Sequence, residues 1–387
     1  MRLKPAALLT GRYDWDPDVL PISEFQNRLA AVHRMLAEHG LSALIVHGNS
    51  TDYAALAYLT EFVPKLGPAF ALISPDHSVR LLVSGSPAMI SAAKRLTWVE
   101  DVQPMGDLKT SIVAWLGESN FRSNTTIGLW GLGAITVRPY GAITAAIEPR
   151  GEIVGLDAAL EPLRLRKSAR EQEILRRASA ILAEAMRELA RAFESGDGMR
   201  STTLAAERAA FRLGAQDARA LASARPGGPP ALPSAYDDCA VDPLLAYVAV
   251  RFAGYWAEGF LTLSRLHNSA LMQAQAGLAA IIRRARPGVT FAELTALAEQ
   301  HVRPYEMHPL TKQSIGNSIG LALEEPHEAV ASVLTLRKDG VYALRCGAAG
   351  QGSDNAIVSA MVHVQESRAE VFWSALPSAE LLTETLP

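Results

Sequence analysis

The sequence is poor in the residues that support thiol or redox chemistry. It has two cysteines in 387 residues, Cys239 and Cys346, and neither has a second Cys or a His at metal-ligand spacing. Disulfide frameworks and zinc sites need clustered ligands, whereas isolated cysteines are typical of buried free thiols. We therefore expect both cysteines to be buried free thiols, and nothing in the sequence indicates a redox cofactor.

Long apolar runs and strongly charged segments are also missing. No apolar span approaches the roughly eighteen residues that a membrane helix needs, and the apolar run near the N-terminus is too short for a signal-peptide core. The formal net charge is −3, with no basic segment that would favour nucleic acid. We expect a cytoplasmic protein whose partner is a small-molecule substrate, with no nucleic acid and no membrane as partner.

The first half of the chain alternates segments typical of helices and strands. The segment 23–40 begins at Ser23, a predicted N-cap, and stops at a glycine. A short buried strand is predicted at 42–48, and 69–85 has the pattern of a hairpin that turns at Pro75 and Asp76. We therefore predict a smaller α/β domain over residues 1–160.

The second half, residues 161–387, opens with a long helix. Ser168 and Glu171 have the spacing of a capping box, and the apolar stripe then continues for about seven turns. The order of long helix, glycine turn and shorter helix recurs from Ser269, which indicates two similar halves. Strand-like segments rich in Val, Tyr, Phe and Trp follow each helix pair. They favour an antiparallel sheet against which the late helices lie, and an α+β domain overall.

A loop rich in Pro and Gly, residues 223–238, separates the two halves of this domain. Irregular backbone of this length is typical either of a functional loop near a site or of a plain surface connection. We expect the part from Arg225 to Pro233 to border the site, because irregular backbone needs solvent or a ligand for its polar groups.

Four segments, in this order, resemble a known family. They are the helix RLRKSAREQEILRRA, the segment GYWAEGFLTLSR, the loop GNSIGL and the closing stretch VHVQESRAEVF. The order resembles the pita-bread fold of methionine aminopeptidase, prolidase, Xaa-Pro aminopeptidase and creatinase. The resemblance covers nearly the whole chain. It implies a C-terminal pita-bread domain with pseudo-twofold halves, a smaller creatinase-type N-terminal α/β domain, and a homodimer.

Metallopeptidases of this family hold two metal ions with two Asp, one His and two Glu. Carried over by motif, the two Asp positions, eleven residues apart, read Tyr247 and Glu258 in this sequence. The loop His reads Asn317, the first Glu reads Arg345, and the second Glu falls near Ser359. Divalent ions need anionic oxygens and imidazole, and an arginine places a permanent positive charge where the metal would lie. The resemblance therefore implies a site with no metal and no other cofactor.

Creatinase is the family's example of hydrolysis without metal. Its mechanism uses a His from the loop that corresponds to the Pro-rich loop, but this sequence has no His between His77 and His267. The creatinase base is therefore missing as well. Ectoine hydrolase, another member without the usual ligands, is an analogue by resemblance alone.

The replacements are polar, and polar side chains are costly to bury without partners. We expect Glu258 and Arg345 to form a buried pair, which either replaces the metal as a structural link or serves catalysis. In the catalytic interpretation, Arg345 binds a carboxylate or amide oxygen and a Glu acts as base. Glu324 occupies the position of a substrate-facing His in the metallopeptidases. We expect crowding by other carboxylates to raise its pKa.

The remaining candidates are assigned to substrate binding, each with a simpler alternative. Tyr247 is also typical of core packing with a satisfied hydroxyl, and His327 of an ordinary surface histidine. The full substrate-binding set is Tyr247, Asn317, Glu325, His327 and Ser359.

Three classes of function remain open. The first is a metal-independent hydrolase that acts on a C–N bond of a small amide or amidine. The second is a catalytically inactive pseudo-aminopeptidase that serves as a binding module. The third is an Xaa-Pro aminopeptidase-like metallopeptidase with displaced ligands, for which Asp237, Asp238 and Asp242 are the nearby acidic cluster. That cluster is also typical of turn residues.

Overall fold

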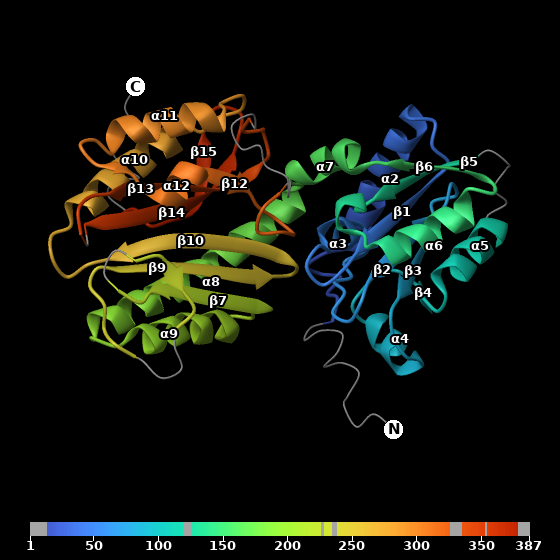
Figure 1. The fold of residues 1–387 in the computed structure, drawn as a ribbon, viewed down its shortest axis with the longest axis horizontal. Coiled ribbons are helices and arrows are strands. Elements are labelled where there is room, and N and C mark those ends of the chain that lie inside the picture. The colour runs from blue at the N-terminus through green and yellow to red at the C-terminus, as the bar shows by residue number, and fades with distance from the viewer. Residues whose placement is uncertain are drawn as a thin grey trace. The chain divides into compact units, whose positions relative to one another are not determined.

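The computed structural model describes residues 14–118, 125–225, 228–233, 238–325, 335–352 and 354–377. The chain divides into two compact units, Met1–Arg164 and Leu165–Pro387. The division falls close to residue 160, where the sequence predicted the domain boundary. Figure 1 shows the elements of each unit.

The first unit is built on a six-stranded mixed sheet in the order β4-β3-β2-β1-β5-β6. Its strands are Ala43–Gly48 (β1), Ala69–Ile73 (β2), Val79–Val83 (β3), Asp101–Pro104 (β4), Thr125–Trp130 (β5) and Gly151–Gly155 (β6). Its helices are Ile22–Glu38 (α2), Ala54–Thr60 (α3), Pro87–Ala93 (α4), Leu108–Glu118 (α5), Val137–Ile147 (α6) and Asp157–Leu165 (α7), with a 3-10 turn at Leu132–Ala134 (η1). The middle strand β1 is buried along its whole length, and α5 and α6 pack against one face of the sheet.

Two predictions for this unit can be checked directly. The hairpin is confirmed, since β2 and β3 pair antiparallel and the Asp76 carboxylate accepts from the Ser78 N–H in the turn at 3.1 Å. The predicted N-cap at Ser23 is wrong, because α2 begins at Ile22 with Pro21 as its N-cap. Proline has a fixed φ and no N–H that needs a partner, so it can precede a helix without a capping side chain.

The second unit contains two antiparallel sheets, each covered by a pair of helices. Its strands are Asp217–Ser223 (β7), Pro230–Ala231 (β8), Leu244–Phe252 (β9), Tyr255–Leu263 (β10), Glu306–Met307 (β11), Gly316–Ser318 (β12), Val341–Ala349 (β13), Asn355–Val364 (β14) and Ala369–Ser374 (β15). Its helices are Ala169–Glu194 (α8), Met199–Arg212 (α9), Ser269–Arg284 (α10), Phe291–His301 (α11) and Pro309–Gln313 (α12). Helices α8 and α9 cover the sheet β10-β9-β7-β8, and α10 and α11 lie with the sheet of β11, β13, β14 and β15, where β12 also pairs with β13 (Figure 1). This is the pita-bread arrangement of two similar halves.

The helix starts in this unit follow the sequence closely. The capping box of Ser168 and Glu171 is confirmed at the start of α8, which runs for 26 residues. The same device, formed by Thr290 and Glu293, begins α11 in the other half. Each box satisfies N–H groups at a helix end that would otherwise lack partners.

The two halves meet along β10 and β14 through side-chain hydroxyls. The Ser359 hydroxyl accepts from the Phe260 N–H at 2.7 Å, and the Thr262 hydroxyl accepts from the Ile357 N–H and donates to its carbonyl, both at 2.9 Å. At Gly259 a Cβ would lie 2.2 Å from the Trp373 ring, so only glycine allows this approach. We call these contacts the seam between the halves.

The cysteine prediction is confirmed only in part. Both cysteines are free, and Cys346 is buried, which raises the pKa of its thiol to about 12. Cys239 is exposed, contrary to the prediction, because it lies in the irregular segment before β9. Among the described residues, no helix combines the length and the apolar character that a membrane crossing needs.

Candidate functional site

Tyr247 and Glu258 come together on one face of the hairpin formed by β9 and β10. The strands are joined by a two-residue turn, Ala253 and Gly254, with φ of 44° and 81°. Positive φ at both residues matches the twist of a tight hairpin. In this register Tyr247 lies opposite Phe260, so Glu258 is its diagonal neighbour. The Tyr247 hydroxyl donates a hydrogen bond to Glu258 Oε2 at 2.5 Å.

Asn317 and Arg345 come together in the other half. Asn317 on β12 lies opposite Ala343 on β13, and the backbone N–H of Arg345 donates to the Ile315 carbonyl at 2.8 Å. The Arg345 Nη2 donates to Asn317 Oδ1. The Asn317 amide nitrogen in turn donates to the Leu323 carbonyl at 2.7 Å, which fixes the orientation of the amide.

These four side chains, Tyr247, Glu258, Asn317 and Arg345, form what we call the polar centre. Glu258 is 6% exposed and Asn317 8% exposed, whereas Tyr247 and Arg345 are half-buried. The aromatic rings of Tyr247 and Phe260 lie 4.8 Å apart beside the centre, and the Arg345 guanidinium lies 5.9 Å from the Phe260 ring. The centre therefore combines a buried carboxyl, a reachable guanidinium and an aromatic wall.

Burial raises the pKa of Glu258 above the usual range of a glutamate. The nearby Arg345 charge and the hydrogen bonds from Tyr247 and Asn317 act in the opposite direction, and the charge of Glu324 adds to the rise. Burial and the neighbouring Glu258 raise the pKa of Tyr247 well above its ordinary value. Tyr247 therefore keeps its proton near neutral pH and remains a hydrogen-bond donor to Glu258.

The expected direct pair of Glu258 and Arg345 is wrong. Among the described residues, no ion pair joins these two side chains, although the charge of Arg345 acts on Glu258. The physical reason is Asn317, whose carbonyl oxygen takes the Arg345 donor. The guanidinium is thus held by a neutral amide and not by the carboxylate.

The roles expected for the two adjacent glutamates change. Glu324, the predicted proton carrier, is exposed, and it is Glu258 whose pKa is raised. Glu325, predicted to bind substrate, is instead buried and paired with Lys167, Nζ to Oε2 at 2.6 Å. A carboxylate held in this way is not available to a ligand.

Two further predicted binding residues lie elsewhere. The Ser359 hydroxyl is engaged by the backbone of Phe260 in the seam, although Ser359 lies directly opposite Arg345 in the pairing of β13 and β14. His327 lies outside the described residues.

The Pro-rich loop contains a short strand that the sequence did not predict, since β8 pairs with Ala222 and Ser223 of β7. Strand β8 lies at the edge of the sheet that carries Tyr247. That the loop borders the site remains a prediction.

The donor set of the polar centre does not fit a divalent metal. A tyrosine, one carboxyl, an amide and a guanidinium supply one anionic ligand and one fixed positive charge. Within the described ranges, no group of three or more His, Cys, Asp or Glu residues could hold a metal ion.

The displaced acidic cluster offers no alternative ligands. Asp238 accepts from the Arg200 N–H at 2.7 Å and from the Ser201 hydroxyl at 2.6 Å, at the start of α9. Asp242 accepts from the Ser264 hydroxyl at 2.9 Å. Both carboxylates are therefore engaged by protein N–H and hydroxyl groups, and Asp237 lies outside the described residues.

Sequence reasoning missed Lys167 and Phe260. Lys167 directly precedes the capping-box serine, and a lysine at a predicted helix start is opposed by the helix dipole, which could have marked it as a residue with a distant partner. Phe260 was hidden because an aromatic residue in a strand usually signals core packing.

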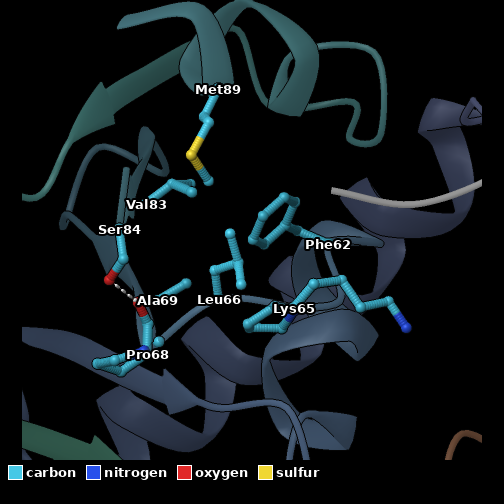
Figure 2. A pocket seen from close by; sticks show the side chains of 10 residues that line it. Phe62, Lys65, Leu66, Pro68, Ala69, Val83, Ser84 and Met89 are labelled. Carbon is cyan, nitrogen blue, oxygen red and sulfur yellow. Dashed lines mark hydrogen bonds between the residues drawn. The ribbon is translucent and has the colours of Figure 1, made fainter. Parts of the chain in front are cut away.

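A separate hollow in the first unit carries no such chemistry. In Figure 2, the side chains of Phe62, Leu66 and Met89 converge on it, while the Ser84 hydroxyl turns to the Pro68 carbonyl at 2.6 Å. Its space suffices for about one water molecule. The walls are apolar, so we assign no site there.

Comparison with known proteins agrees with this architecture. Residues 173–366 match Metallopeptidase family M24, and residues 28–166 match the Creatinase/Prolidase N-terminal domain. No curated protein matches the sequence.

Several solved structures share the fold at low sequence identity. X-Pro aminopeptidase from Thermotoga maritima MSB8 is similar with a TM-score of 0.74 and 18% identity, covering 90% of this chain and 98% of that chain. Prolidase from Pyrococcus furiosus has a TM-score of 0.66 and 17% identity, covering 88% and 98%. Dipeptidase PepE from Mycobacterium ulcerans has a TM-score of 0.68 and 17% identity, covering 94% and 97%. The chain has the fold of the creatinase/prolidase-like hydrolases and belongs to metallopeptidase family M24.

Proposed function

We propose that the protein is a metal-independent hydrolase that cleaves a C–N bond in a small polar amide or amidine. The observation that carries this proposal is the state of Glu258. It is a buried carboxyl with a raised pKa, hydrogen-bonded by Tyr247 and close to a half-buried guanidinium. A carboxyl whose pKa is raised by burial can accept and return a proton in catalysis.

Arg345 is the group that binds the substrate. One of its N–H groups is engaged by Asn317, and no other hydrogen bond of its guanidinium is found among the described residues. The planar guanidinium presents paired donors that suit a carboxylate or an amide oxygen. The rings of Tyr247 and Phe260 provide an apolar wall beside that position.

Glu258 acts as the base in the proposed reaction. Its carboxylate takes a proton from water, and the resulting hydroxide forms a bond to the carbon of the C–N group. In an amide, the carbonyl oxygen takes the negative charge of the tetrahedral intermediate, and Arg345 stabilises it as donors in an oxyanion hole do. In an amidine, the imino nitrogen takes this charge instead. Glu258 then gives the proton to the leaving nitrogen, and the C–N bond breaks. Tyr247 remains protonated throughout and holds the carboxyl in place.

The proposal is tested with a panel of N-acyl amino acids and small amidines, assayed with and without a chelator. We expect turnover that survives the chelator and a loss of about 10²- to 10⁴-fold in Glu258→Gln, as for removal of a general base. Arg345→Met should lose turnover and weaken binding, whereas the control Arg170→Met, which alters a surface ion pair with Glu173, should change neither. Two tightly bound metal ions per chain, or turnover abolished by the chelator, would contradict the proposal.

A second candidate function is a catalytically inactive binding module. The observation that favours it is the closure of the polar centre, in which Asn317 and the Tyr247 hydroxyl already find protein partners. In that case a small carboxylate binds through Arg345, and the whole panel is left uncleaved. Calorimetry on the same panel separates the two candidates.

We also propose that the protein is a homodimer, on the basis of its resemblance to prolidases and creatinase. Sedimentation at micromolar concentration should then show twice the chain mass of 41.5 kDa. A species with the mass of a single chain would contradict the dimer without affecting the proposed reaction.

A further inference from the structure

A buried ion pair lies next to the polar centre but is not part of it. Lys167 Nζ and Glu325 Oε2 are 2.6 Å apart, and each side chain is 1% exposed. Lys167 lies near the start of the second unit and is 158 positions from Glu325 in the chain. Taking two charges out of water is costly, so a pair this deeply buried demands an account of what it holds.

The pair holds the turn formed by residues 320–325. The second carboxylate oxygen of Glu325 accepts from the Ala322 N–H at 3.2 Å, across the turn. The Glu325 N–H donates to the Ser318 carbonyl at 2.8 Å, which ties the end of the turn to β12. The Trp256 N–H donates to the Gly320 carbonyl at 2.7 Å, so the turn is also fixed to β10, two residues from Glu258.

The same turn orients Asn317. Its Leu323 carbonyl accepts from the Asn317 amide nitrogen at 2.7 Å, which leaves the amide oxygen for Arg345. If the turn moved, the amide could rotate and exchange its donor and acceptor ends. The hydrogen bond between the Arg345 guanidinium and the Asn317 oxygen would then be lost.

Gly320 shows how tightly the pair and the turn fit. A Cβ at this position would lie 2.6 Å from Lys167 Nζ and 2.8 Å from Glu325 Oε2. The φ of Gly320 is not in the left-handed region, so the demand for glycine comes from the two charged groups and not from the backbone.

We propose that Lys167 and Glu325 are positioning residues, which hold the 320–325 turn so that Asn317 presents its carbonyl oxygen to Arg345. The importance of this arrangement for catalysis rests on the proposed function. The positioning of Asn317 by the pair is independent of the proposed function. The prediction is that disturbing the pair changes the environment of the Asn317 side chain, although among the described residues no side-chain hydrogen bond joins Asn317 to Lys167 or Glu325.

The test is NMR of the full chain with ¹⁵N-labelled asparagine, and without any substrate. The side-chain NH₂ signals of Asn317 are identified by their loss in Asn317→Ser. In the double variant Lys167→Met/Glu325→Leu, which removes both charges of the pair together, we expect these signals to shift by more than their line width. The matched control is Lys338→Met/Glu366→Leu, which removes an exposed pair and should leave them unchanged.

A folded double variant with unshifted Asn317 signals would overturn the proposal. If the double variant does not fold, Gly320→Ala gives the same test, because its methyl group displaces the pair while both charges remain. In the conservative variant Lys167→Arg, which keeps a positive charge at this position, we expect the Asn317 signals to stay at their wild-type positions. That result would support a positioning role over general destabilisation. Failure of every substrate in the hydrolase panel would remove the proposed function and leave this result standing, so the two outcomes are distinguishable.

Discussion

Two buried carboxyls in the second unit are held in opposite ways. Glu325 is in direct contact with the ammonium of Lys167 at 2.6 Å. Glu258 receives a hydrogen bond from Tyr247 at 2.5 Å, and Arg345, whose charge acts on Glu258, bonds Asn317 instead. A carboxylate in direct contact with an ammonium group forms an ion pair, and the pair holds the surrounding structure in place. Burial raises the pKa of Glu258 despite the hydrogen bond from Tyr247, and a carboxyl in this state can exchange a proton.

The largest expected effect on stability comes from breaking the ion pair of Lys167 and Glu325. Lys167→Met leaves the buried charge of Glu325 without the ammonium that it contacts, so we expect the free energy of unfolding to fall by about 3–5 kcal/mol. The double variant Lys167→Met/Glu325→Leu should cost much less, because both charges of the pair are removed together. Urea unfolding of the wild type, Lys167→Met, Glu325→Leu and the double variant measures the coupling energy between the two side chains. Additive costs would show that the two side chains do not interact.

A smaller effect is expected at Glu258, which among the described residues is held by a hydrogen bond and not by an ion pair. Tyr247→Phe removes one donor to Glu258, and the loss of this hydrogen bond should lower the free energy of unfolding by about 1–3 kcal/mol. The variant should also raise the pKa of Glu258 further, since the Tyr247 hydrogen bond favours the ionised form. Titration of the Glu258 carboxyl by ¹³C NMR measures this shift. A lower pKa in the variant would contradict the assignment of Tyr247 as donor.

The pH dependence of stability separates the two carboxyls further. The pKa of Glu258 is raised in the folded protein, so its contribution to stability is fully present below the unfolded value of about 4.3 and is lost as the pH rises through the folded pKa. Relative to Glu258→Gln, the wild type should therefore lose stability as the pH rises above about 4.3. Denaturant unfolding from acid to neutral pH checks the sign. If the wild type instead gained stability relative to Glu258→Gln as the pH rises, the raised pKa of Glu258 would be contradicted.

The smallest effect is expected at a carboxylate that solvent reaches. Glu370 forms two hydrogen bonds of 2.9 Å with Arg176, which lower the pKa of Glu370 to about 2. Its side chain is 33% exposed, so we expect Glu370→Gln to cost only about 1 kcal/mol at neutral pH. Because the pKa is depressed, this contribution should disappear as the pH falls from about 4.3 towards 2. Equal costs at both ends of that range would exclude the ion pair as the cause.

The sequence could predict features that depend on local pattern. The capping box at Ser168 and the hairpin around Asp76 follow from short-range chemistry, and both are confirmed. The position of Tyr247 and Glu258 on facing strands also follows from their spacing, because a tight turn between two strands fixes the register.

The parts that failed depend on contacts across long stretches of chain. Glu324 and Glu325 are adjacent in a turn, where no periodicity tells which side chain is buried. What distinguishes them is Lys167, 158 positions away, whose ammonium selects Glu325. In the same way, no local signal shows that Asn317 stands between Arg345 and Glu258. Pairwise reasoning over charges therefore joined two residues that a neutral side chain separates.

The seam between the halves has a consequence for how the polar centre is arranged. Tyr247 and Glu258 belong to one sheet, and Asn317 and Arg345 belong to the other. The proton-exchanging half and the cationic half are thus mounted on separate sheets, aligned by the backbone contacts of Ser359 and by those of Thr262. The Arg345 guanidinium of one sheet lies 5.9 Å from the Phe260 ring of the other. The separation between the guanidinium and the Glu258 carboxyl is therefore set by the alignment of the two sheets at the seam, and not by a direct ion pair between the two groups.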